Sequence, residues 1–550
     1  DRDTVTLPDT IELPRLLDFY ELQTAEHTGI HEFYENLQTG RLTTTQCVDC
    51  GETQFPPRVV CPDCHSDDLE YVDLPHDGEL FAFSTVRAGP PMGMEDEGPY
   101  RRGRRRSAVD AYRRGTVRGP RDRRPGHAEG RRDRRSRRPR ARLLPIRTEV
   151  TRVQDYELTI TKFLQRAVDQ FDHKEIVTKQ SDGGLHRYTY GDAYERICKL
   201  AHALDDYGLD RGDRVSVMAA NHYRHFELYF GPSCSGRSIH TTNHRLPEHH
   251  LVEMINEASD RLLFVDPAFV DTVEAIAADL ETVEQYVVLA DEVPPETTLG
   301  PVVDYESFIE GYDASYDWPE LDENTEFALC YTSGTTGMPK GVQYYHRRMF
   351  LHTLIHGHVD VFGVGESDAV MPVVPMFHVN GWGFPYTATF YGSKLVLPGQ
   401  HTDPPDIADL IHEEDVTVAA AVPTVWIEMD SYLESAEDVS LDSLDRVLTG
   451  GSAPPSSLMR KYEEEYEAPI YQGYGMTEAS PHLVNTFETT ETGSLPDEER
   501  YELMRKAGIP APGARIRLRD TDGDPVPHDG ESKGEIHARS PRSEERRVGK

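Results

Sequence analysis

Several features that would place this chain in a special class are missing from its 550 residues. No apolar run approaches the roughly 18 residues needed to span a bilayer. The chain begins Asp-Arg-Asp-Thr, without the basic and then apolar segment of a secretory signal. Seven cysteines are too few for a disulfide scaffold in a chain of this length. These absences predict a soluble, cytoplasmic, globular protein.

Positive charge is also scarce, and it is unevenly placed. The chain has 96 acidic and 58 basic residues, giving a formal net charge of −38. Residues 101–147 contain 20 Arg, no Lys and 4 acids, a net of +16, which leaves −54 on the remainder. Dense carboxylates keep a protein soluble where salt screens their repulsion, so this acidity favours a salt-adapted (halophilic) protein.

The Arg-rich tract at 101–148 has three interpretations. A nucleic-acid-binding arm would use its charge on phosphates, but Tyr112 is the only aromatic residue there that could stack on bases. A disordered linker is a second interpretation. A shifted reading frame is the one we favour, because Arg, Gly, Pro and Ala have GC-rich codons and abruptly replace an acidic sequence.

Four of the cysteines form two CxxC pairs, Cys47–Cys50 and Cys61–Cys64, separated by ten residues. Each pair can present two thiolates from one tight turn, and four thiolates make a closed tetrahedral zinc site. Two redox dithiols or unrelated cysteines are the alternatives. A site closed by four cysteines leaves no open position for water, so we expect zinc to be structural.

The surroundings of these cysteines resemble the DUF35 family of zinc-ribbon and OB-fold proteins. An amphipathic segment at 30–37 precedes the cysteines, and a strand-like segment at 78–86 follows them. The resemblance covers about residues 25–90 and implies a lead at 1–29, then a ribbon and partial OB-fold at 30–100. It also implies a thiolase-like or other acyl-CoA enzyme as a partner.

From residue 149 to 540, apolar runs alternate with amphipathic stretches. This alternation predicts an α/β domain whose parallel sheets are covered by helices. The expected strands are 214–219, 261–266, 285–290, 327–331, 394–397, 416–422 and 446–448, and the expected helices are 190–207 and 248–258. Cys198, Cys234 and Cys330 are expected to be buried thiols. The segment 231–237, Gly-Pro-Ser-Cys-Ser-Gly-Arg, is less apolar than expected and is interpreted as a second local frame error.

The strongest local motif is Tyr331-Thr-Ser-Gly-Thr-Thr-Gly-Met-Pro-Lys-Gly341, directly after an apolar run. Its glycines permit close approach of the backbone, its hydroxyls donate hydrogen bonds, and Lys340 adds positive charge, so it can wrap a triphosphate. It differs from the usual P-loop because Met338 and Pro339 stand before the Lys. A plain Gly/Ser/Thr linker is the alternative.

This loop and four other segments, in the same order, resemble the adenylate-forming superfamily. The other segments are Pro375-Met-Phe-His-Val-Asn-Gly-Trp382, Thr449-Gly-Gly-Ser-Ala-Pro454, Tyr471-Gln-Gly-Tyr-Gly-Met-Thr-Glu478 and Gly534-Glu-Ile536. The resemblance implies a large domain of parallel sheets flanked by helices, with a β-barrel part. It also implies ATP, Mg²⁺ and CoA as the small molecules of the reaction.

The resemblance assigns roles to individual residues. It implies an ATP site formed by Thr332, Ser333, Gly334, Thr335, Thr336, Gly337, Lys340, Val379, Gly450, Gly451, Ser452, Gln472, Gly473, Tyr474 and Thr477. It gives catalytic roles to Thr332, Lys340, Thr477 and Glu478, and Mg²⁺ contacts to Thr332 and Glu478. It gives the acid to His378, Trp382, Gly451 and Ala453. Buried core residues are the alternative for His378 and Trp382, and a helix N-terminal acid is the alternative for Glu478.

Segments 156–164, 240–246 and 375–382 resemble medium- and long-chain fatty acyl-CoA synthetases. The implied reaction joins a fatty acid, ATP and CoA into acyl-CoA, AMP and pyrophosphate through an acyl-adenylate. An acyl-adenylate passed to another acceptor, and a non-enzymatic acyl-CoA-binding accessory protein, are the alternatives. The last residues, 541–550, match nothing in the family, so we expect the small C-terminal domain to be missing and this chain to have little ligase activity alone. A homodimer is also considered.

Overall fold

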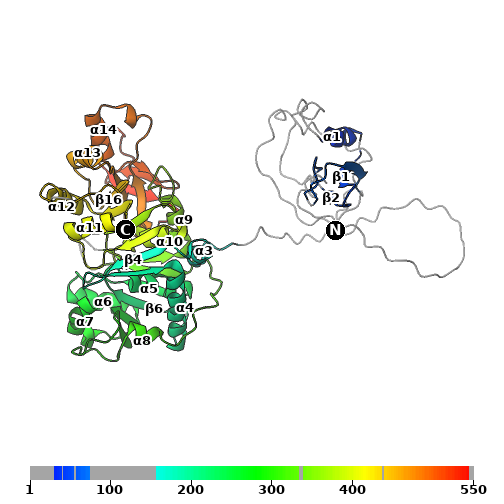
Figure 1. Cartoon of the computed structure of the whole chain (residues 1–550). Helices are drawn as coiled ribbons and strands as arrows, with labels where there is room; N and C mark the ends of the chain where they lie inside the picture. Colours follow the sequence, from blue (N-terminus) through cyan, green and yellow to red (C-terminus); the bar gives the residue numbers. More distant parts are fainter. Residues whose placement is uncertain are drawn as a thin grey trace, which may run out of the picture. The chain divides into compact units, whose positions relative to one another are not determined.

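The computed structural model describes residues 30–39, 41, 43–54, 57–62, 64–74, 156–332, 339–436 and 439–543. The chain divides into two compact units, Asp1–Asp155 and Tyr156–Lys550, coloured along the sequence in Figure 1. The lead at 1–29, the strand-like segment at 78–86, the Arg-rich tract and the tail beyond Ser543 lie outside the described residues.

The first unit is small and antiparallel. It contains α1 (His31–Gln38), β1 (Thr43–Cys47), β2 (Thr53–Gln54) and β3 (Leu69–Asp73). The sheet has the order β2-β1-β3, with Thr45 opposite both Gln54 and Tyr71. The helix confirms the amphipathic segment expected at 30–37.

The second unit alternates strands and helices along most of its length. Its helices are α3 (Thr161–Phe171), α4 (Tyr190–Asp206), α5 (Tyr223–Cys234), α6 (Glu248–Ala258), α7 (Val270–Ile276), α8 (Tyr305–Ile309), α9 (His346–His356), α10 (Phe384–Tyr391), α11 (Pro404–Glu413), α12 (Pro423–Leu433), α13 (Ser456–Glu465) and α14 (Asp497–Met504). Its strands are β4 (Glu175–Lys179), β5 (Leu185–Thr189), β6 (Arg214–Met218), β7 (Ser238–Thr241), β8 (Leu262–Val265), β9 (Gln285–Val288), β10 (Val302–Asp304), β11 (Glu326–Tyr331), β12 (Gly341–Tyr345), β13 (Ala369–Pro372), β14 (Lys394–Leu397), β15 (Val418–Ala421), β16 (Arg446–Gly450), β17 (Ile470–Gly475), β18 (His482–Asn485), β19 (Ile509–Pro510), β20 (Arg515–Arg519) and β21 (Glu535–Arg539).

Two large sheets organise this unit. The seven-stranded sheet has the order β10-β9-β8-β6-β7-β11-β12 and is parallel except for β12. The nine-stranded sheet has the order β19-β18-β17-β16-β15-β13-β14-β4-β5. Its central strands, from β17 to β4, are parallel, and antiparallel strands extend it at both ends. The mainly parallel α/β expectation is confirmed.

The sheets and helices form alternating layers. The largest apolar core joins α3, α4, α5 and α10 to strands of both sheets, and it includes Phe163, Phe226 and Tyr386, all inaccessible to solvent. A second core packs α11–α13 on the nine-stranded sheet, and a third packs α6 and α7 on the seven-stranded sheet. Figure 1 shows β6 between α6 and α4. Because the central strands are buried on both faces, their sequences are continuously apolar.

Every expected strand and helix of this unit exists, with shifts at the ends. The expected strand 261–266 stops at Val265 because Asp266 instead turns its carboxylate back to accept from Ala268 N, at 3.0 Å. The described residues contain no closed barrel where one was expected. A two-stranded antiparallel ribbon, β20–β21, is present instead, and two strands are too few to close into a barrel. No described helix has both the length and the apolar character needed to cross a membrane.

The unexpected segment at 231–237 has a structural reason. It ends helix α5, and a Cβ built on Gly231 would lie 2.4 Å from Leu200 Cδ2 of α4. A glycine therefore lets the two helices approach closely. Buried Arg237 forms an ion pair with Asp205 at 2.6 Å and donates to the Leu209 carbonyl, so this segment is an integral part of the fold.

Candidate active site and zinc centre

The two CxxC segments fold into matching turns. Gly51 N donates to the Cys47 carbonyl at 2.9 Å, and His65 N donates to the Cys61 carbonyl at 3.0 Å. Gly51 and His65 both adopt the left-handed backbone conformation, with φ values of 76° and 60°. In each turn, the residue after the second cysteine folds back on the first cysteine, which brings both sulfurs to the same side.

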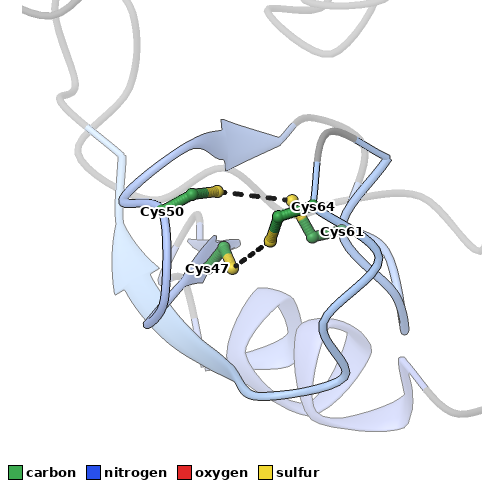
Figure 2. A group of neighbouring side chains, drawn as sticks. All are labelled: Cys47, Cys50, Cys61 and Cys64. Atoms are coloured by element: carbon green, nitrogen blue, oxygen red, sulfur yellow. Dashed lines mark hydrogen bonds between the residues drawn. The ribbon is translucent and has the colours of Figure 1, made fainter.

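The four sulfurs converge on one point (Figure 2). Cys47 Sγ lies 3.5 Å from Cys64 Sγ, and Cys50 Sγ lies 3.6 Å from Cys61 Sγ. All four ligand atoms lie within 4.8 Å of one another. Zn–S bonds of about 2.3 Å in a tetrahedron place sulfurs roughly 3.8 Å apart, so the donor set fits a structural zinc ion. Among the described residues, this is the one group of three or more ligating side chains.

The second unit contains a cleft of about 950 Å³. Eleven of the predicted site residues line it: Thr332, Lys340, His378, Val379, Trp382, Gly450, Gly451, Gly473, Tyr474, Thr477 and Glu478. They come from the hairpin β11–β12, from the segment before α10, and from the ends of β16 and β17. Motifs up to about 145 residues apart in the chain therefore meet in one place.

The predicted phosphate loop is the connection of the β11–β12 hairpin. Thr332 N donates to the Lys340 carbonyl at 3.0 Å, and Lys340 N donates to Thr332 Oγ1 at 3.3 Å. These bonds continue the strand pairing and fix both ends of the loop. Ser333, Gly334, Thr335, Thr336 and Gly337 lie outside the described residues, so their expected phosphate contacts stay predictions.

A hydrogen bond connects this hairpin to the motif that carries Glu478. Tyr344 Oη, on β12, donates to the carbonyl of Thr477 at 2.6 Å. Thr477 begins a short 3₁₀ helix, η5 (Thr477–Ala479), which follows β17 after the single residue Met476. Tyr344 therefore fixes the position of the Thr477 backbone relative to the loop that ends at Lys340.

Trp382 is presented by an unusual turn. Five consecutive residues, Val379 to Gly383, have positive φ values between 49° and 79°. Such a run is rare for L-residues, and Val379 is β-branched, which makes it an outlier. Gly381 N donates to the His378 carbonyl at 3.1 Å, and Gly383 N donates to the Asn380 carbonyl at 2.9 Å. The turn reverses the chain and brings the Trp382 indole beside Gly450.

Gly450 and Gly473 are paired neighbours on β16 and β17. A Cβ built on Gly450 would lie 2.9 Å from the Gly473 carbonyl oxygen and 3.3 Å from Trp382 Cη2. A Cβ on Gly473 would lie 3.3 Å from Phe362 Cζ. Both positions must lack a side chain for the strands and the aromatic rings to approach as they do.

We expect Gly450→Ala to weaken nucleotide binding at least about tenfold, because the added methyl group would meet backbone and displace Trp382. Isothermal calorimetry with ATP measures this effect. Gly365→Ala is the matched control for folding, because Gly365 has no positive φ and a Cβ built there meets nothing within 4 Å. Equal ATP affinity in Gly450→Ala and the unmodified chain would contradict the expectation.

Three predicted residues lie beside the cleft without lining it. Ser452 and Ala453 follow Gly451 and are exposed. Gln472 is buried, and its side-chain Oε1 has no hydrogen-bond partner among the described residues. Its backbone exchanges hydrogen bonds with Thr486. Gln472 therefore lies beside the cleft, while its neighbours Gly473 and Tyr474 line it.

Sequence reasoning missed several residues of the cleft. Those outside every predicted motif are Glu253, Glu257, His356, Phe362, Val422, Leu448, Pro481 and His482. Pro339, Thr449, Gly475 and Met476 lie within the predicted motifs but were given no role of their own. Glu253 and Glu257 are four apart on α6, so they lie on one face of the helix. From sequence alone, two acids at this spacing look like part of an ordinary solvent-exposed helix surface. Tyr331 Oη donates to Glu257 Oε2 at 3.3 Å, which links α6 to the strand before the phosphate loop.

Burial shifts the pKa of His378 and of the three thiols of the second unit. His378 faces the cleft, but the surrounding protein desolvates it and lowers its pKa, so it is neutral at neutral pH. Cys198, Cys234 and Cys330 are buried, as expected, and burial raises the pKa of Cys330 to about 12. These thiols are therefore poor nucleophiles.

Comparison with known proteins agrees with this geometry. Residues 164–543 match the AMP-binding enzyme family, and residues 35–70 match the ChsH2, rubredoxin-like zinc ribbon domain. A long-chain-fatty-acid–CoA ligase of Thermus thermophilus is 41% identical over 71% of this chain and 70% of its own length. A medium-chain-fatty-acid–CoA ligase of Ectopseudomonas oleovorans is 35% identical over 70% of each chain. A 3-methylmercaptopropionyl-CoA ligase of Ruegeria pomeroyi is 37% identical over 70% of this chain and 71% of its own.

Solved structures show the same fold. A long-chain-fatty-acid-CoA ligase from Archaeoglobus fulgidus superimposes with a TM-score of 0.61, at 19% identity, over 70% of this chain and 76% of its own. The N-terminal domain of FACL13 from Mycobacterium tuberculosis gives a TM-score of 0.60, at 22% identity, over 70% of this chain and 89% of its own. The loop, the cleft and the order of the motifs thus have one common explanation. The chain belongs to the AMP-binding enzyme family of adenylate-forming acid–thiol ligases and carries a zinc ribbon ahead of its ligase domain.

Proposed function

We propose that the cleft activates a fatty acid of medium to long chain with ATP and transfers it to CoA, giving acyl-CoA, AMP and pyrophosphate. The observation that carries the proposal is that the cleft is lined by residues of two chemically different kinds. Lys340, Thr332, Thr477 and Glu478 offer charge and hydroxyl groups, whereas Phe362, Trp382, Val422 and Leu448 offer apolar surface. An acid with a polar head and an alkyl chain matches both kinds.

The polar residues of the cleft can reduce the repulsion between two anionic reactants. The acid carboxylate must approach the α-phosphate of ATP, and both groups are anions. Lys340 places a positive charge beside the loop, and hydroxyl donors at Thr332 and Thr477 favour phosphate oxygens. Gly450 and Gly451 let the nucleotide approach the backbone. Tyr474 provides an aromatic face on which we place the adenine ring.

Three carboxylates line the same cleft: Glu253, Glu257 and Glu478. Their negative charge opposes a polyphosphate unless a divalent cation lies between them. The hydroxyl and carboxylate oxygens of Thr332 and Glu478 suit Mg²⁺, which commonly binds few protein ligands together with phosphates and water. We therefore include Mg²⁺ in the proposal, where it would neutralise charge on the phosphate oxygens.

A substrate series tests the proposed acid. Burial of each CH₂ group is worth about 0.8 kcal/mol, so kcat/KM for acid-dependent pyrophosphate release should rise roughly fourfold per CH₂ until the pocket is full. Acetate, butyrate, octanoate, dodecanoate and palmitate span the range. Activity confined to acetate or to benzoate would contradict the proposal.

The acceptor requires its own measurement. Replacing CoA with a phosphopantetheinylated carrier protein distinguishes a CoA ligase from an enzyme that loads another thiol. In a complete enzyme we expect thioester to form with CoA, and formation only with the carrier protein would contradict this part of the proposal. The matched control is octanol, which can contact the apolar residues but has no carboxylate to activate.

Three finer points complete the proposal. The net charge of −38 supports a salt-adapted enzyme in a salty cytoplasm, whose activity should persist at molar KCl. The zinc ribbon supports docking of an acyl-CoA enzyme of the thiolase type. We also include a homodimer in the proposal, and size-exclusion chromatography with light scattering would test it.

A further inference from the structure

Two histidines line the cleft beside Phe362. His356 ends helix α9, and His482 begins β18. The His482 ring stacks on Phe362 with centroids 4.8 Å apart, and the His356 ring meets Phe362 edge-on at 4.9 Å. The histidines are only 1% and 4% exposed. A phenylalanine at either position would fill the same space, so packing alone does not explain why these residues are histidines.

The hydrogen bonds of His356 determine which ring nitrogen carries the proton. Thr387 Oγ1 donates its hydrogen to the Gly383 carbonyl at 3.0 Å. The contact of His356 Nδ1 with Thr387 Oγ1, at 3.1 Å, must then be donated by the histidine. His356 Nε2 is consequently an unprotonated acceptor, and it has no partner among the described residues.

His482 reaches the same state by another contact. Its Nε2 lies 3.2 Å from the Val484 carbonyl, which can only accept, so Nε2 carries the proton. His482 Nδ1 is then an unprotonated acceptor, also without a partner among the described residues. Burial lowers the pKa of His482 to about 3 and holds the pKa of His356 well below its usual value. Both rings are therefore neutral, and both bare nitrogens remain acceptors at neutral pH.

The charge around the pair limits what can bind there. The positive charge of Arg542 lowers the pKa of both histidines, and Arg542 is buried, with Nη1 and Nη2 that have no partners among the described residues. His352, which lies against His356 with ring centroids 3.9 Å apart, is likewise buried, and burial lowers its pKa. A neighbouring guanidinium disfavours an ammonium group, so a neutral donor is the better match. A buried acceptor without a partner is unfavourable, and a ligand that supplies a donor removes this deficit.

We propose that the acid activated in this cleft carries a hydroxyl group on its alkyl chain, which donates to His356 Nε2 or to His482 Nδ1. The substrate class is thus a hydroxy-substituted fatty acid, an inference that rests on the proposed function. A pocket that only accommodates a hydroxyl discriminates weakly, whereas one that hydrogen-bonds it rejects the unsubstituted analogue strongly.

The test measures binding without turnover. Acyl-sulfamoyl adenosines are stable analogues of acyl-adenylates, and the 550-residue chain is titrated with the octanoyl analogue and with isomers hydroxylated at each carbon from C3 to C8. We expect one isomer to bind at least about tenfold more tightly than the octanoyl analogue. His356→Phe or His482→Phe should bring that ratio to about one. His356→Gln, whose amide can still accept, should retain part of it, and the exposed-histidine control His412→Gln should keep it unchanged.

Each other result has one meaning. If the octanoyl analogue binds and no isomer binds more tightly, the hydroxyl inference is wrong and the fatty-acid proposal stands. If no analogue binds at all, the proposed function fails and this inference fails with it. If Arg542→Gln removes the preference and neither histidine variant does, the guanidinium is the partner and the histidine assignment is overturned.

Discussion

In a complete enzyme, replacing Glu478 with Gln should reduce acid-dependent pyrophosphate release by roughly 100-fold or more. Glu478 lines the cleft together with Thr332, Lys340 and Thr477, the residues that we place around the phosphates. Glutamine keeps the size and shape of the side chain but removes the charge that would attract Mg²⁺. Loss of one electrostatic contact to a transition state typically costs about 10²–10³ in rate.

Two measurements check this expectation. Pyrophosphate release with octanoate reports the chemical step, and ATP titrations with and without Mg²⁺ report binding independently of turnover. The effect of Mg²⁺ on ATP affinity should be much smaller in Glu478→Gln than in the unmodified chain. Glu464→Gln, an exposed position on helix α13, removes the same charge away from the cleft and should change neither result. Unchanged pyrophosphate release in Glu478→Gln would refute the role of this carboxylate.

Removal of zinc should unfold the ribbon and leave the second unit folded. The described ribbon has three short strands and one helix, and its buried apolar side chains are few: Cys47, Cys61 and Leu74. A core of this size is too small to stabilise a fold without a metal or disulfides. Zinc binding in such sites contributes roughly 10–16 kcal/mol, which is coupled to folding.

Chelation provides the measurement. Treatment with a strong chelator should release one zinc ion per chain and remove one of two transitions in differential scanning calorimetry. Cys61→Ser should have the same effect without chelator. Cys198→Ala, which removes a buried thiol of the second unit, should keep the metal. A ribbon transition that survives complete metal removal would show that the four thiolates are not what holds the ribbon together.

The parts of the fold that the sequence predicts are those with a local signal. Apolar runs such as 394–397 predict a strand with the observed bounds, because both faces of the sheet are buried. The spacing of the cysteines predicts the metal centre, since each pair makes its own turn. By contrast, β17 (Ile470–Gly475) contains two glycines and three polar or aromatic residues, a composition typical of a loop. Its neighbours in the sheet decide its conformation.

The residues that line the cleft are harder to predict from the sequence than the strands are. Thr332 and Glu478 belong to motifs that can be seen in one dimension, and both line the cavity. His356 and His482 lie on a helix and a strand 126 positions apart, in segments with no motif of their own. Only the three-dimensional packing shows that their rings meet, with centroids 5.8 Å apart.

The left-handed turn at Val379–Gly383 affects how easily the lining of the cleft around Trp382 can be altered. Each non-glycine residue in this conformation costs about 1–2 kcal/mol relative to the right-handed one, so Val379, Asn380 and Trp382 together hold roughly 3–6 kcal/mol. The contacts around the turn offset this energy. If a ligand disturbs those contacts, the turn can release this energy by changing its backbone conformation. Moving Trp382 should therefore require less free energy than moving the strands beside it. Among related sequences, changes in this short turn would alter substrate access while leaving both sheets intact.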